Sequence, residues 1–430
     1  METVNRRQFL GQTGVASLSA LQYTHAADAP LEKVNVAVMG LRGRGKLLAS
    51  HFAGLKDAQV VALCDVDESL FPAVVKTVAE KQGREPKLVQ DVRKLLGDKS
   101  IHAIVIAAPN HWHALAAVWA CQAGHDVYVE KPVSHNIVEG RRMVEAARKY
   151  ERIVQSGTQR RGSKHWLAAA EYLKSGKIGH IGMARAWINR KRPNIGHPKD
   201  EAVPKGVDYD LWQGPAPAHA FNPNRFHYNW HWFWDYGGGE LANNGVHMLD
   251  MARLGLGVDA PTRITSTGGK FSYDDDQQTP DTQLVTYEFP GTILLWEHRC
   301  WSNFGLLNEE GPVRIGGGLI YYGDKGTLTI NDKGWQAYVD GKVVDKQDGE
   351  EDSLGVITSF VESVKTRKMP NADIEEGHRS TTLCHLGNVS HRVGRPVQWD
   401  GKLERFIKDD EANRYLSREY RKPFVLPEKV

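Results

Sequence analysis

Three glycines and one acidic residue near the start of the chain have the spacing of a dinucleotide-binding turn. Gly40, Gly43 and Gly45 follow a β-branched apolar run at residues 34–39, and Asp65 follows a second apolar run. In such a turn, backbone N–H groups at the positive end of a helix bind the pyrophosphate, and the acid binds the ribose hydroxyls. Because its charge would repel the 2′-phosphate of NADP, Asp65 favours NAD as the cofactor.

The glycine spacing departs from G-x-G-x-x-G at its middle position, which is Arg42. A side chain there obstructs the close approach of the backbone to the pyrophosphate, although a guanidinium can pair with phosphate instead. On the spacing alone, a plain β-turn is the alternative. The apolar runs on either side and Asp65 favour the dinucleotide site.

Two further groups of chemically useful residues stand where apolar runs end. The runs at 101–107 and 125–129 are typical of buried parallel strands. The residues of interest that follow them are Pro109, Asn110, His113, Glu130 and Lys131. Ligands of open α/β sheets bind at the carboxyl ends of the strands, so we expect these residues on one rim with Gly40 and Asp65, around the cofactor.

The elements that position these residues form an α/β pattern. A helix is expected from about residue 46 to 55, between strands at 34–39 and 60–64, and this alternation predicts a Rossmann domain over 32–155. Residues 156–430 are expected to form an α+β domain.

Strand-like runs dominate the middle of this second domain. Those at 283–289, 293–298 and 326–330 are separated by turns and predict a large open, mainly antiparallel sheet. Helices within 354–394 and the C-terminal tail are expected to pack back on the core.

An aromatic stretch lies between Trp187 and Trp234 and is rich in hydrogen-bonding side chains. Aromatic rings can stack on the C–H faces of sugars while polar groups bind their hydroxyls, so the stretch favours a carbohydrate substrate. The candidate substrate-binding residues are Trp212, His227, His231, Asp235 and Tyr236. An aromatic core cluster or a dimer interface is the alternative, because Trp and Tyr are common in both.

The composition limits the classes of function. There are 55 basic and 52 acidic residues, a net charge of +3, and no basic stripe, which argues against a nucleic-acid partner. No apolar run reaches the length of about 20 residues that a membrane span needs. The four cysteines are scattered and form no metal-ligand pattern, so we expect buried free thiols and no metal.

Residues 1–27 resemble a signal peptide. Arg6 and Arg7 precede an uncharged, mildly apolar stretch at 11–23 and a small-residue cleavage site at 26–27. The string resembles the twin-arginine export signal, which implies a periplasmic or other extracytoplasmic location. The alternative is an amphipathic N-terminal helix of the folded protein.

Nearly the whole chain after this segment resembles the Gfo/Idh/MocA family, the relatives of glucose–fructose oxidoreductase and inositol dehydrogenase. The shared motifs are the glycine turn, Ala-Pro-Asn-His-Trp-His at 108–113, Glu-Lys-Pro at 130–132, Asp-Leu-Trp-Gln-Gly-Pro at 210–215, Trp-Asp-Tyr-Gly-Gly-Gly at 234–239 and Glu-Ala-Asn-Arg at 411–414. The resemblance implies an NAD-dependent oxidoreductase acting on a secondary hydroxyl of a sugar, sugar derivative or cyclitol. It also implies a homo-oligomer formed through the C-terminal sheet.

The resemblance further implies that Lys131 helps to move the hydroxyl proton while hydride passes to the nicotinamide. This requires that burial or a neighbouring cation lowers the pKa of the lysine. The family motif places an Asp four residues before a His on one helix face, and here these positions are Asn243 and His247. Because an amide cannot accept a proton at neutral pH, the relay is altered. The candidates to assist it are Tyr228, His231, Asp235 and Glu240.

Lys131 and His247 each have an alternative, non-catalytic interpretation. Lys131 would then contact phosphate or ribose without acid–base duty, and His247 would be a helix histidine capped by Asp250.

Three functions remain open at this point. In the first, a tightly bound NAD oxidises a sugar hydroxyl and is regenerated on the enzyme, since a periplasm supplies no free NAD pool. In the second, a glycoside hydrolase or lyase works by transient oxidation, elimination and re-reduction. In the third, a non-catalytic sugar-binding protein uses the same fold, which the departures at Arg42 and Asn243 would indicate.

Overall fold

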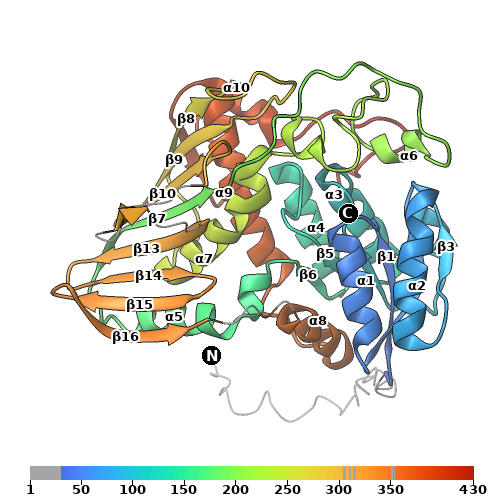
Figure 1. Cartoon of the computed structure of the whole chain (residues 1–430), viewed down its shortest axis with the longest axis horizontal. Coiled ribbons are helices and arrows are strands. Elements are labelled where there is room, and N and C mark those ends of the chain that lie inside the picture. Colours follow the sequence, from blue (N-terminus) through green and yellow to red (C-terminus); the bar gives the residue numbers. More distant parts are fainter. Residues whose placement is uncertain (1–30, 304–306, 309–310, 313–315, 350–351, 353) are drawn as a thin grey trace, which may run out of the picture. The chain divides into compact units, whose positions relative to one another are not determined.

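Figure 1 shows the fold of the chain in a computed structural model. It describes residues 31–303, 307–308, 311–312, 316–349, 352 and 354–430. The expected signal segment at 1–27 lies outside the described residues. Two large sheets dominate the described part, one in each half of the chain.

The first sheet has six parallel strands in the order β3-β2-β1-β4-β5-β6. They are β1 (Val34–Met39), β2 (Ala58–Cys64), β3 (Lys87–Val89), β4 (Ala103–Ile106), β5 (Asp126–Val129) and β6 (Val154–Ser156). The connecting helices are α1 (Arg44–Gly54), α2 (Phe71–Gln82), α3 (Asn110–Ala123) and α4 (Ile137–Lys149). The strand order reverses between β1 and β4, which confirms the predicted Rossmann fold and creates a ligand crevice at their carboxyl ends.

The residues before α1 and α3 set where these two helices begin. Helix α1 starts at Arg44 rather than at residue 46, because Gly43, with a φ of 47°, turns the chain directly from the glycine loop into the helix. Helix α3 starts at Asn110, because Pro109 has a fixed φ of −58° and leads straight into the first turn. Both helix N-termini therefore point their first N–H groups at the crevice.

The second sheet has ten strands in the order β16-β15-β14-β13-β7-β10-β9-β8-β17-β18. They are β7 (Ile181–Asn189), β8 (Arg263–Gly269), β9 (Thr282–Phe289), β10 (Thr292–Arg299), β13 (Gly317–Gly323), β14 (Thr327–Asn331), β15 (Gly334–Val339), β16 (Lys342–Asp348), β17 (Val397–Asp400) and β18 (Arg405–Phe406). Strands β7 and β10 pair in parallel, and the other described pairs of this sheet are antiparallel, as predicted. Strand β11 (Leu307–Asn308) pairs antiparallel with β12 (Gly311–Pro312).

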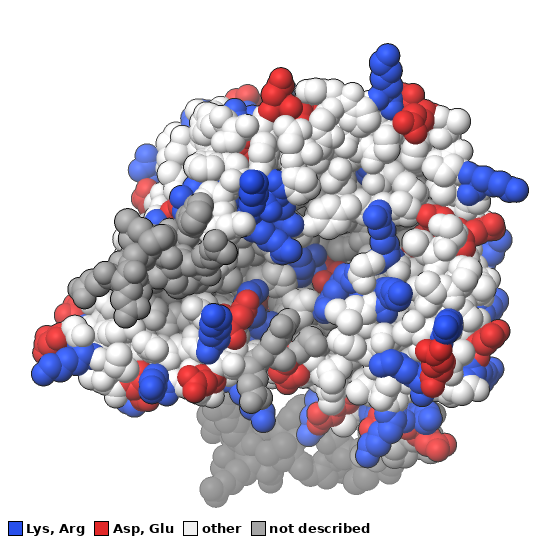
Figure 2. All heavy atoms as spheres, in the orientation of Figure 1, with Lys and Arg blue, Asp and Glu red and all other residues white. Residues whose placement is uncertain are grey.

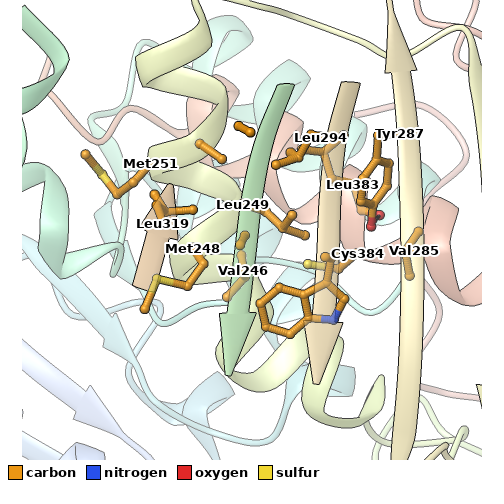
Figure 3. Close-up of a cluster of buried hydrophobic side chains, with 14 of the residues drawn as sticks. Val246, Met248, Leu249, Met251, Val285, Tyr287, Leu294, Leu319, Leu383 and Cys384 are labelled. Carbon is orange, nitrogen blue, oxygen red and sulfur yellow. Dashed lines mark hydrogen bonds between the residues drawn. The ribbon is translucent and has the colours of Figure 1, made fainter. Parts of the chain in front are cut away.

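One face of this sheet is covered by helices. They are α5 (Lys164–Lys174), α7 (Val246–Leu256) and α9 (Ile374–Val393). In Figure 3, Val246 and Leu249 of α7 lie with Leu294 of β10 in the buried cluster between helix and sheet. Each fully buried side chain of this size contributes about 1.5–3 kcal/mol, so the cluster fixes the position of α7, which carries the candidate His247.

The C-terminal helices pack back on the core, as expected. Helix α8 (Gly355–Thr366) covers the first sheet, where the Phe360 ring lies 6.3 Å from that of Phe52 and 5.7 Å from that of Tyr128. Helix α9 packs against both α4 and α7. The short helices are α6 (Tyr209–Gln213), α10 (Asp410–Asn413) and the 3-10 turns η1 (Glu68–Leu70), η2 (Val92–Lys94), η3 (Gln159–Gly162), η4 (Asn229–Trp232) and η6 (Arg414–Leu416).

Cys64, Cys121, Cys300 and Cys384 are all buried free thiols. Within the described residues, no helix combines the length and apolar character that a membrane crossing requires. The same residues contain no cluster of potential metal ligands.

Candidate active site

A cavity of about 450 Å³ opens at the carboxyl ends of the Rossmann strands. Most of the predicted site residues line it, although they come from both halves of the chain. The predicted residues in its wall are Gly40, Arg42, Gly43, Asp65, Pro109, Asn110, His113, Glu130, Lys131, Trp212, His227, Tyr228, His231, Asn243 and His247. The structure therefore brings the expected cofactor residues and the expected proton-transfer residues to one place.

The glycine turn forms a cradle at the start of α1. The N–H groups of Arg42, Gly43 and Arg44 have no hydrogen-bond partner among the described residues, and a Cβ at Gly43 would meet no atom within 4 Å. Free N–H groups at a helix N-terminus attract phosphate. Gly45 does not line the cavity, contrary to its assignment as a cofactor residue. It packs against the turn instead, where a Cβ would lie 1.6 Å from the Gly40 carbonyl oxygen.

Asp65 stands at the end of β2 with both carboxylate oxygens oriented by the backbone. Oδ2 accepts a hydrogen bond from the Leu41 N–H at 2.6 Å, and Oδ1 accepts one from the Asp67 N–H at 3.0 Å. Burial raises the pKa of Asp65 to about 6, against the stabilising effect of these N–H groups. The carboxylate is thus ionised at neutral pH, and its remaining lone pairs can accept ribose hydroxyls.

Glu130 is paired with a residue that the sequence did not single out. Arg44 Nε lies 2.7 Å from Glu130 Oε1, which ties the glycine turn to the end of β5. His113 is also engaged, because its ring nitrogens lie 2.8 Å and 2.7 Å from the backbone oxygens of Pro132 and Ala108. Both side chains therefore support the crevice through contacts within the protein.

Lys131 lines the cavity and contacts the second half of the chain. Its Nζ donates to the backbone oxygen of Asn243 at 2.6 Å and lies 3.3 Å from Asn243 Oδ1. Burial lowers the pKa of Lys131 to about 8, with Glu130 opposing and Arg44 reinforcing the effect. Near pH 8 the amine is therefore present in both forms, as a group that takes up and releases protons requires.

Asn243 and His247 are not related by a regular helical turn. Asn243 lies in a π-helical turn (Leu241–Gly245, η5), and α7 begins after it at Val246. Turns of this kind are rare in proteins, and those that occur are often found at functional sites. Burial lowers the pKa of His247 well below its usual value, so its ring is neutral. The structure does not support the capping alternative: no hydrogen bond joins His247 to Asp250 among the described residues, and Asp250 forms a buried ion pair with Arg161 at 2.8 Å.

Three hydrogen-bonding residues of the aromatic stretch, His227, Tyr228 and His231, line the cavity. The Tyr228 hydroxyl accepts a hydrogen bond at 3.0 Å from Arg192, which also pairs with the buried Glu240. His231 lies 2.5 Å from the Tyr228 carbonyl oxygen through Nδ1, and burial lowers the pKa of His231 to about 3. His227 lies 2.7 Å from Asp67 Oδ2, which fastens the stretch to the end of β2.

Other parts of the stretch belong to the core. Tyr236 is 1% exposed and lies in an aromatic cluster with Trp212, and Asp235 lies 2.8 Å from His219. Neither Asp235 nor Tyr236 lines the cavity, so their assignment as substrate contacts is not supported by their position. The core-cluster alternative describes this part of the stretch, since aromatic patterns alone do not distinguish core from site.

A second cavity of about 960 Å³ adjoins the first and was not predicted. Arg44, Gln159 and His247 line both cavities. The rest of its wall comes from η3, α5 and the ends of strands in the second sheet, segments too far apart in the sequence to reveal a common site. Gln90 and Asp91, which follow the three-residue strand β3, were also missed in the wall of the first cavity.

Two family models match the chain. The model described as the oxidoreductase family with an NAD-binding Rossmann fold (Gfo/Idh/MocA) matches residues 34–158. The model for the C-terminal alpha/beta domain of the same family matches residues 186–295 and 333–426. The chain belongs to this family.

Curated relatives match over the Rossmann part. An inositol 2-dehydrogenase of Salmonella typhimurium is 32% identical over 145 residues, 33% of this chain and 42% of that protein. A glycosyl hydrolase family 109 protein of Stenotrophomonas maltophilia is 32% identical over 130 residues, 29% of each chain. The match thus spans less than half the length of these relatives.

Solved structures share the fold over a longer stretch. The aldose–aldose oxidoreductase of Caulobacter crescentus superposes with a TM-score of 0.64 at 18% identity and covers 85% of this chain and 99% of that one. At this identity the likeness establishes the fold alone.

Proposed function

We propose that this protein is an NAD-dependent oxidoreductase that acts on a secondary hydroxyl of a sugar, sugar derivative or cyclitol. The observation that carries the proposal is the position of Lys131. Its amine, with a pKa lowered to about 8, lies where the cofactor cavity meets the second half of the chain. A buried amine with this pKa is suited to exchange a proton with a hydroxyl.

The residues of the crevice fit NAD. The free N–H groups of the glycine turn would hold the pyrophosphate, and Asp65 would accept the adenosine ribose hydroxyls. Arg42 is exposed in the cavity wall and would add a cation beside the phosphates. When bound, NAD supplies a hydride acceptor and donor, and the protein supplies orientation and the proton route.

The proton route begins at Lys131. Oxidation of a secondary hydroxyl removes a hydride from carbon and a proton from oxygen, and the neutral amine of Lys131 accepts this proton. The backbone carbonyl oxygen of Asn243, 2.6 Å from Lys131 Nζ, orients the amine and accepts a hydrogen bond from its charged or its neutral form. Neutral His247 can accept a hydrogen bond from the substrate, whereas the Asn243 amide cannot take a proton.

A second candidate is a glycoside hydrolase that oxidises its substrate transiently, eliminates the leaving group and reduces the product again. The match to a family 109 glycosyl hydrolase over the Rossmann part favours it. Such a reaction leaves the cofactor unchanged overall, and it uses the same hydride and proton positions.

We further propose a tightly bound NAD, export by the twin-arginine route and a homo-oligomer. The basic pair at Arg6 and Arg7 supports export to an extracytoplasmic compartment, which in turn requires a captive cofactor. The uncovered face of the second sheet supports an oligomer through exposed apolar side chains. These are Met183, Leu284, Ile293 and Tyr322.

The first experiment is to purify the folded protein, denature it and assay the supernatant for NAD(H) and NADP(H). Stoichiometric NAD supports the proposal and is followed by tests with free sugars, sugar pairs and glycosides. NADH formation from free sugars identifies the dehydrogenase, and product release from a glycoside without net NADH identifies the hydrolase. A protein that is empty and does not bind added NAD would refute both and leave a sugar-binding protein.

A further inference from the structure

The second cavity, next to Lys131, carries more positive than negative charge. Its cations are Arg44, Arg160, Arg190 and Lys333, and its acids are Asp332 and Asp352. Figure 2 shows Lys and Arg side chains, together with some Asp and Glu side chains, around the hollow near the centre of the view.

Both acids already have partners within the protein. Asp332 accepts two hydrogen bonds from Arg160, at 3.1 and 3.0 Å. Asp352 accepts from the backbone N–H groups of Leu354 and Gly355 at the start of α8, at 3.0 and 2.7 Å. Asp332 is thus paired with Arg160, and Arg44 is paired with Glu130. Neither acid of the wall is bonded to the two remaining cations, Arg190 and Lys333.

Two of these cations are free. The side chains of Arg190, which follows β7, and Lys333, in the turn between β14 and β15, have no hydrogen-bond or ion-pair partner among the described residues. They line the second cavity and not the first, whereas the glycine turn that would hold the pyrophosphate lines the first. Their charge is therefore available to something other than the cofactor.

The neutral polar groups of the wall also present donors. Asn189, Asn303 and Asn331 use their Oδ1 atoms to accept hydrogen bonds from protein N–H groups at 3.1, 2.7 and 2.8 Å. Their NH₂ groups have no partner among the described residues. A wall with free ammonium, guanidinium and amide donors, and with its carboxylates occupied, is complementary to an anion.

This donor-rich wall reaches the catalytic centre. His247 borders both cavities, and burial lowers its pKa, with smaller contributions from Lys131, Arg160 and Arg44. The second cavity thus meets the first at His247, beside the position where the reacting hydroxyl would lie.

We infer that the substrate is a sugar derivative carrying an anionic group, a carboxylate or a phosphate, and that the second cavity binds this group at Arg190 and Lys333. The inference rests on the proposed function for the reaction at Lys131. It adds that the acid group anchors the substrate, so that its secondary hydroxyl reaches the amine. Charge-assisted hydrogen bonds of this kind give both affinity and orientation.

The test compares neutral and acidic forms of the same sugars on the protein as purified with its cofactor. D-glucose, D-galactose and D-mannose are each paired with the uronate and the 6-phosphate, and binding is measured by calorimetry while NADH is followed optically. We expect an acidic member to bind at least about tenfold more tightly than its neutral partner. The uronates and 6-phosphates show whether the site prefers a carboxylate or a phosphate.

The Arg190→Gln/Lys333→Gln variant is expected to lose the preference for acidic sugars. The control variant Arg84→Gln/Lys342→Gln, changed at exposed sites elsewhere, is expected to keep it.

The outcomes separate the two proposals. Two results would overturn the anion site and leave the proposed oxidoreductase intact. One is that neutral sugars are oxidised as efficiently as acidic ones. The other is that the Arg190→Gln/Lys333→Gln variant keeps the wild-type preference for acidic sugars. Tight binding of an acidic sugar without any hydride transfer or glycoside cleavage supports the anion site and refutes the proposed function. Preference for an acidic sugar together with NADH formation supports both.

Discussion

Replacing Asn243 by Asp tests whether Lys131 is the group whose titration controls turnover. Asn243 is buried, and its Oδ1 lies 3.3 Å from Lys131 Nζ. A carboxylate oxygen at that distance would attract the ammonium by about 5 kcal/mol at an effective dielectric constant of about 20. Since about 1.4 kcal/mol corresponds to one pKa unit, even a third of this attraction raises the pKa of Lys131 by about one unit.

The assay is the pH profile of kcat/KM for hydroxyl oxidation by the NAD-loaded protein. In the wild type the rate is expected to rise with pH and to level off above about 8, because the neutral amine of Lys131 accepts the proton. In Asn243→Asp this rise moves to higher pH by at least about one unit. Asn243→Ala removes the side-chain amide without adding charge and keeps the backbone carbonyl. The rise of kcat/KM in this variant is therefore expected at nearly the same pH as in the wild type. An Asn243→Asp profile that overlays the wild type would refute the reasoning.

Three further predictions concern the two sides of the crevice. Lys131→Ala is expected to lower kcat by about 10²–10⁴-fold while the purified protein keeps its NAD, and wild-type turnover would exclude the proton-transfer role. Asp65→Ala is expected to narrow the preference for NAD over NADP in binding titrations. In the wild type the preference should narrow as the pH falls through about 6, where the carboxyl gains a proton and its repulsion of the 2′-phosphate is lost; a constant preference would place the discriminating acid elsewhere. Gly45→Ala is expected to destabilise the fold by about 1–3 kcal/mol, because its Cβ would collide with the Gly40 carbonyl oxygen. Gly97→Ala, with no atom within 4 Å of its Cβ, is the control, and equal thermal melting of the two variants would contradict the packing argument.

The parallel strands of the first half were predictable because burial on both faces requires continuous apolar sequence. The run at 34–39 became β1, and the polar residues after the runs became the rim of the crevice. The glycine turn was predictable for a similar reason, since few sequences allow a strand to turn directly onto a helix N-terminus. Gly45 shows the limit of that inference, because the same glycine spacing serves packing as well as ligand contact.

The aromatic stretch was less informative. Residues of this stretch that are only a few positions apart lie in different places in the fold. Tyr236 is buried in the aromatic cluster, whereas His231 lines the cavity. A stretch with little regular secondary structure has no fixed periodicity from which facing could be inferred. The second cavity had no sequence signal either, because Arg160, Arg190 and Lys333 come from three separate segments.

The sequence by itself determined the Rossmann half and the sheet of the second half, and it named the residues that we propose bind a dinucleotide and move a proton. These follow from local patterns of burial, turn chemistry and side-chain type. Only the tertiary structure decided what the central residues can do. The pKa of Lys131 depends on its burial and on the charges of Glu130 and Arg44, and its contact with Asn243 joins residues 112 positions apart. Burial and electrostatic coupling are set by distances in space, and those distances exist only once the two halves of the chain have packed together.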